Sequence, residues 1–190
     1  MIDLRSVFNT LILAAAVSYA TSLPAQEIAR DADTLLNRLG TLTAEGDQPE
    51  AQRLAGEILE RWSHSGSPAM DLLLTRGRDA IGEGDLPRAI THLTALTDHA
   101  PDFAEGWNQR ATAFFLMQRY GEAISDIEQV LILEPRHFGA LAGLGIILQQ
   151  LGESDEALDA LRRAQQVFPA QENVNDAVDM LERETGERAL

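Results

Sequence analysis

The sequence predicts an all-α protein built as a stack of helix-turn-helix repeats. Its composition favours helices over sheets, because alanine and leucine are common while aromatic residues make up 5% of the chain. The chain also matches itself at an offset of 34 residues, where one residue type returns in three successive units: Pro101, Pro135 and Pro169, and likewise Ala89, Ala123 and Ala157. A period of this length is typical of paired helices that stack on one another.

The repeats span 70–103, 104–137 and 138–171, and each is predicted to hold two helices. In the second repeat one apolar stripe at helical spacing marks the first helix and another marks the second: Trp107, Ala111 and Phe114, then Tyr120, Ala123, Ile127 and Val130. The turn between the helices carries a glycine in the flanking repeats, at Gly84 and Gly152. Each second helix ends near the recurring proline, which cannot continue a helix.

Small residues recur where the two helices of a repeat come together. Helix axes about 8 to 10 Å apart leave little room for side chains at their closest approach, and Gly77 with Ala89 is predicted to be such a contact. The stretch Gly143-Leu144-Gly145 has part of the glycine spacing of a phosphate-binding loop. It lies inside a predicted helix with no strand before it, so close helix packing is the better interpretation.

The period and several residue identities together resemble the tetratricopeptide repeat: Trp107, Ala111 and Phe114 in the first helix, Ala123 in the second, and the closing Pro135. The resemblance covers residues 70–169. It implies a right-handed superhelical stack of helix-turn-helix units. In such a stack the small rotation between units produces a concave groove lined by the first helices.

The segments on either side of the three repeats fit the same template less well. Residues 26–69 are predicted to form a degenerate N-terminal repeat and a loop, with Trp62 packing as a lid on that end of the stack. Residues 172–190 are predicted to form a charged amphipathic capping helix, because a stack of repeats must end on a polar outer face.

Residues 1–25 have the layout of a signal peptide. Arg5 precedes an apolar run from Leu11 to Val17, and small residues follow at Ala20 and Ala25. The run is shorter than the roughly 20 apolar residues that span a bilayer. We therefore expect cleavage after Ala25, with Ala20 as the weaker alternative, and a periplasmic or secreted mature chain without stable membrane insertion.

Charge and residue types narrow the class of function. The formal net charge of −15 repels phosphate backbones and so argues against nucleic-acid binding. A basic protein partner fits this charge, although solubility alone also explains it. The chain has no cysteine, and its histidines, at His64, His92, His99 and His137, are scattered, which favours surface or capping roles over a metal site. No catalytic triad spacing appears. We expect neither enzymatic activity nor a cofactor.

The predicted function is binding of a protein or peptide segment in the concave groove. The candidate residues lie on the faces of the first helices that point away from the packing stripe: Asp71, Leu74, Arg78, Ile81, Glu105, Asn108, Thr112, Phe115, Ile146 and Gln149, with Gly139 and Ala142 on the same face. Some members of the family hold an acidic C-terminus with a clamp of lysine, asparagine and arginine. This chain has no lysine and lacks that clamp. The alternative is a structural subunit of an envelope or secretion complex, or a homodimer formed through the caps or the convex face.

Overall fold

The computed structural model describes the backbone of residues 32–188. The predicted signal peptide and both of its candidate cleavage sites lie outside the described residues. The chain divides into two compact units, Met1–Leu35 and Leu36–Leu190. All the helix pairs described below belong to the second unit.

The described residues form helices and turns and contain no strand. After a helical stretch at 32–39 the elements are α3 (Gln48–Trp62), α4 (Pro68–Gly82), α5 (Leu86–His99), α6 (Ala104–Leu116), α7 (Tyr120–Leu133), α8 (Phe138–Leu151), α9 (Ser154–Val167) and α10 (Glu172–Arg188). This confirms the predicted all-α stack of helix-turn-helix units. In the described part of the chain, no helix has the length and apolar character needed to cross a bilayer.

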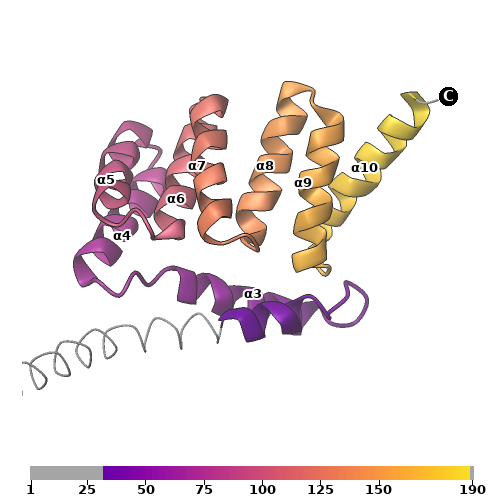
Figure 1. Cartoon of the computed structure of the whole chain (residues 1–190), viewed down its shortest axis with the longest axis horizontal. Coiled ribbons are helices and arrows are strands. Elements are labelled where there is room, and N and C mark those ends of the chain that lie inside the picture. Colours follow the sequence, from indigo (N-terminus) through magenta and orange to yellow (C-terminus); the bar gives the residue numbers. More distant parts are fainter. Residues whose placement is uncertain (1–31, 189–190) are drawn as a thin grey trace, which may run out of the picture. The chain divides into compact units, whose positions relative to one another are not determined.

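Three helix pairs stand side by side, α4 with α5, α6 with α7 and α8 with α9, and α10 packs against α9 (Figure 1). Small residues allow the close contact inside each pair, as predicted. A Cβ atom added at Gly77 would lie 2.5 Å from Leu93, and one added at Gly145 would lie 2.5 Å from Leu161. Real Cβ atoms do not approach so closely, so neither position accepts a side chain unless its neighbour moves.

The turns inside the pairs use the left-handed region of the backbone. Gly84 and Gly152, the predicted turn glycines, have φ of 77° and 83°. The second repeat places Gln118 at the equivalent point, with φ of 57°. A residue with a Cβ atom pays roughly 1–2 kcal/mol for this conformation. The second repeat therefore contains a strained turn that the flanking repeats avoid.

Helix α3 contacts parts of the stack that are distant in sequence. The Nε2 group of Gln48 donates to the carbonyl of Ala170 at 2.8 Å, and the ring of Trp62 stacks on His137 with centroids 4.3 Å apart. Figure 1 accordingly shows α3 passing along the loops that join one pair to the next. The prediction that Trp62 covers the N-terminal end of the stack is wrong, because its ring lies against His137 and Phe138, where the second repeat meets the third. Whether residues 26–69 derive from a degenerate repeat stays a prediction.

Candidate functional site

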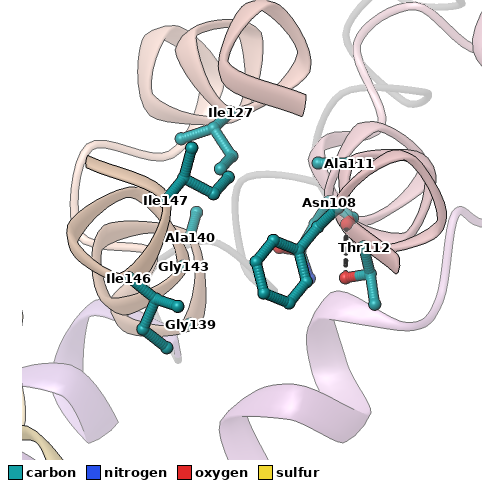
Figure 2. Close-up of a pocket in the computed structure, with 10 residues that line it drawn as sticks. Asn108, Ala111, Thr112, Ile127, Gly139, Ala140, Gly143, Ile146 and Ile147 are labelled. Carbon is teal, nitrogen blue, oxygen red and sulfur yellow. Dashed lines mark hydrogen bonds between the residues drawn. The ribbon is translucent and has the colours of Figure 1, made fainter. Parts of the chain in front are cut away.

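A pocket opens between α6 and α8 (Figure 2). Its volume is about 150 Å³. The residues that line it are mostly apolar and come from three helices: Asn108, Ala111, Thr112 and Phe115 of α6, Ile127 of α7, and Gly139, Ala140, Gly143, Ile146 and Ile147 of α8. The deeper members, among them Ile127 and Ile147, are buried, whereas Ile146 is 39% exposed. The pocket therefore joins the apolar interior to the surface.

Gly143 leaves room for the pocket because it has no side chain. A Cβ atom built there would meet only the Cδ1 atom of Ile127, at 3.8 Å, which is an ordinary van der Waals distance. Helix packing therefore does not require glycine at this position. The prediction that close packing explains both glycines of the Gly143-Leu144-Gly145 stretch is right for Gly145 and wrong for Gly143. Glycine inside a helix costs about 0.5–1 kcal/mol relative to alanine, so Gly143 gives up stability where the pocket opens.

A buried carboxylate lies beside this pocket. The side chain of Glu105 is 1% exposed and accepts four hydrogen bonds: from Arg78 Nη2, from Asn108 Nδ2 at 3.0 Å, from Gln109 Nε2 at 2.7 Å and from His137 Nε2 at 3.2 Å. Burial on its own would raise the pKa of Glu105. The hydrogen bonds from His137 and Gln109, with the charge of Arg78, outweigh burial and hold this pKa below its ordinary value. Glu105 is therefore ionised at neutral pH.

His137 ties this carboxylate to the start of α8. Its Nδ1 atom accepts the backbone N–H of Ala140 at 3.1 Å, which caps the helix. An accepting Nδ1 carries no proton, so the neutral ring has its proton on Nε2 and donates it to Glu105. His137 is fully buried. The sequence predicts a surface or capping role for the histidines, and His137 has the capping role.

The structure brings four of the predicted groove residues together at the pocket: Asn108, Thr112, Phe115 and Ile146. Gly139, expected on the same face, also lines it. Ala142, by contrast, is 7% exposed and belongs to the core between α8 and α9. Gln149 is half-buried and lies outside this pocket.

The predicted groove residues of α4, together with Glu105, make contacts within the fold. Leu74 and Glu105 are each 2% exposed, so the prediction that they face an open groove is wrong. Leu74 is held in the core between α4 and α5, against which Ile81 also packs. Arg78 is paired with Glu105, and Asp71 accepts hydrogen bonds from the backbone and hydroxyl of Ser65.

The sequence pattern does not reveal the deeper walls of the pocket, which are formed by Ala111, Ile127, Ala140 and Ile147. The sequence predicts Ile127 in the packing stripe of a second helix, and it does belong to the core. Ile127 also reaches the pocket, because α8, which packs against it, has a glycine at Gly143 and no side chain there to cover it. The sequence feature that could have indicated the pocket is therefore Gly143, a glycine on the groove face of one helix, together with Ile127 of the preceding helix.

Four described histidines and many carboxylates are present, yet among the described residues no group of three or more could hold a metal ion.

Comparisons with known proteins agree with this architecture. Two family models described as tetratricopeptide repeat match residues 74–128 and 114–181. A TPR repeat-containing protein of Rhizobium etli is 39% identical over 162 residues, which covers 85% of this chain and 76% of that protein. The chain belongs to the tetratricopeptide repeat family. Sperm-associated antigen 1 of Rattus norvegicus is 30% identical over 109 residues, 57% of this chain but 12% of that much longer protein.

Solved tetratricopeptide repeat structures share the fold. The first repeat domain of Spaghetti (RPAP3), bound to the HSP90 peptide SRMEEVD, superposes with a TM-score of 0.61 at 20% identity, covering 63% of this chain and 95% of that one. MamA superposes with a TM-score of 0.60 at 21% identity, covering 76% and 82%. At these identities the likeness concerns the fold alone.

Proposed function

We propose that this protein is a non-enzymatic binding module whose pocket between α6 and α8 receives one apolar side chain of a peptide or protein segment. The observation that carries the proposal is the pocket opened at Gly143, where packing leaves space for a side chain and the helix would be more stable with one. An apolar cavity of about 150 Å³ is large enough for benzene. One leucine, isoleucine or phenylalanine side chain therefore fits.

The chemistry of the walls supports an anchoring role. The buried floor offers only carbon atoms at Ala111, Ile127 and Ile147, so an apolar side chain loses no hydrogen bond on entering. Burying such a side chain contributes about 1.5–3 kcal/mol. That is less than a micromolar complex needs, about 8 kcal/mol. The rest of the bound segment must therefore contact other parts of the groove.

A filled pocket tests this proposal. Gly143→Leu places a side chain in the cavity, and Gly56→Leu is the matched control, because Gly56 also lies inside a helix and has no atom within 4 Å of an added Cβ. A displayed library of random 12-residue peptides is selected on each variant. The wild type and Gly56→Leu should enrich peptides with an aliphatic or aromatic residue at one fixed position, and Gly143→Leu should retain them at least about tenfold less. Equal retention by all three proteins would place binding elsewhere.

We also propose that the module acts outside the cytoplasm. The support is in the sequence, where Arg5, the run from Leu11 to Val17 and the small residue Ala25 have the order of a cleaved leader. Intact-mass measurement of the chain from its native host should give a protein that begins at Gln26, or at Thr21 if cleavage follows Ala20. A cytoplasmic chain that keeps Met1 would refute export.

A second candidate function is a permanent subunit contact through the outer surface. The observation in its favour is Ile132 on α7, which is 72% exposed although it is a large apolar residue. If this surface joins two copies, sedimentation of the wild type should show a dimer that Ile132→Asp converts to a monomer. A wild-type monomer at the highest accessible concentration would remove the homodimer from consideration.

A further inference from the structure

Glu105 occupies what would otherwise be an anion-binding site. Its carboxylate collects donors from three elements: Arg78 of α4, Asn108 and Gln109 of α6, and His137 at the start of α8. Four donors converging on one point are what a bound carboxylate requires. Here the carboxylate belongs to the protein itself. The donors next to the pocket are consequently engaged before any partner arrives.

The same contact fixes the orientation of the Asn108 amide. An ionised carboxylate only accepts hydrogen bonds, so the amide nitrogen of Asn108 must be the atom that points at Glu105. The oxygen Oδ1 is then turned away from Glu105. It has no hydrogen-bond partner among the described residues, and Asn108 itself is half-buried and lines the pocket.

Thr112 presents a second acceptor on the same helix. Its hydroxyl donates to the backbone carbonyl of Asn108 at 3.0 Å, the dashed contact in Figure 2. Because that hydroxyl already donates its proton, Oγ1 can only accept a hydrogen bond from a ligand. The polar edge of the pocket, Asn108 with Thr112, therefore offers acceptors beside an apolar cavity.

We infer that the pocket selects an internal protein segment, which inserts an aliphatic side chain and donates a backbone N–H to the acceptor edge formed by Asn108 and Thr112, and that it rejects a terminal or side-chain carboxylate. A carboxylate placed at this edge would meet acceptor oxygens and could not displace Glu105 from its donors. The formal net charge of −15 adds to its exclusion. This inference rests on the proposed function and names the chemistry of its ligand.

Three small probes that share one leucine side chain test the inference by NMR titration of the full mature chain. Acetyl-leucine methylamide has two N–H donors, acetyl-leucine has a free carboxylate, and acetyl-N-methylleucine dimethylamide has no donor. The amide signals of Gly143 and the methyl signals of Ile127 report on the pocket. The methylamide should shift them at concentrations at least about tenfold lower than either other probe. Titration in high salt screens the net charge, and the carboxylate should remain the weaker ligand there.

Two variants separate the acceptor edge from the buried network. Asn108→Ala should strongly reduce the preference for the methylamide over the donor-free probe, because only the Thr112 hydroxyl then remains as an acceptor at this edge. Gln109→Ala removes another hydrogen bond to Glu105 but lies outside the pocket, so this variant should keep the preference. Equal loss in both variants would show that the network, not Oδ1 of Asn108, sets the selectivity, and would overturn the inference.

Failure of the inference can be told apart from failure of the proposed function. If the probes shift Gly143 and Gly143→Leu prevents the other shifts, but the carboxylate binds as well as the methylamide, the pocket is a binding site and the inferred selectivity is wrong. If no probe shifts the pocket signals in the wild type, the proposed function and the inference fall together.

Discussion

Two glycines on α8, separated by one residue, have opposite roles on its two faces. Gly145 faces α9, where a Cβ atom would lie 2.5 Å from Leu161. Gly143 faces α6 and α7, where a Cβ atom would meet only Ile127 at 3.8 Å. The first glycine permits two helices to pack, whereas the second leaves a pocket. Glycine in a helical repeat therefore indicates close packing only on the face that meets the helix's partner.

The largest effect on stability is expected in the hydrogen-bond network around Glu105, next to the pocket. Arg78→Ala should destabilise the fold by about 2–3 kcal/mol, because it leaves the buried Glu105 carboxylate without its arginine partner. This is less than the usual cost of breaking a fully buried ion pair, because Arg78 itself is partly exposed. Urea unfolding measures this. The matched control is Arg162→Ala, whose exposed pair with Glu182 should contribute little. Equal midpoints for the two variants would mean that Glu105 does not depend on Arg78.

On the packed face, Gly145→Ala should cost about 1–3 kcal/mol, since the added methyl group must displace Leu161. The added Cβ atom would also lie 3.3 Å from the backbone carbonyl oxygen of Ala157, which cannot rotate away as a side chain can. Thermal unfolding should show a clear fall in Tm. An unchanged Tm would contradict the close approach of α8 and α9.

The turn of the second repeat offers a stabilising change. Gln118→Gly should raise stability by about 1 kcal/mol, because it relieves a left-handed conformation that the flanking repeats assign to glycine. Lower stability would indicate that the side chain of Gln118 makes a compensating contact. The reverse substitution at the third repeat, Gly152→Gln, should lower stability by a similar amount.

The smallest effect on stability is expected at Gly143, on the face of α8 that lines the pocket. Gly143→Ala should stabilise the fold by about 0.5–1 kcal/mol, because alanine favours the helix and its methyl group meets no close neighbour. Measured beside Gly145→Ala, it should have the opposite sign. Two losses of stability would mean that both faces of α8 are packed.

Sequence alone predicted the helix pairs and the packing at Gly77, because both depend on contacts inside one repeat, which the period of 34 residues displays. It also located Asn108, Thr112, Phe115 and Ile146, which share the groove face of their helices.

The features that the sequence did not predict depend on contacts between repeats. The burial of Glu105 requires donors from three elements, and a charged residue in a helix is ordinarily assigned to the surface. The course of α3 is fixed by contacts of Gln48 with Ala170 and of Trp62 with His137. No periodicity records such pairings, because each occurs once.

The central claim is that the space left by Gly143 is where a partner's side chain binds. Intermolecular nuclear Overhauser effects test it most directly, with a selected library peptide carrying a labelled leucine at its fixed position. The account predicts contacts from the leucine methyl groups to the methyl groups of Ile127 and Ile147 in the floor of the pocket. Contacts to Ile132 on the outer surface, with none to Ile127, would contradict it.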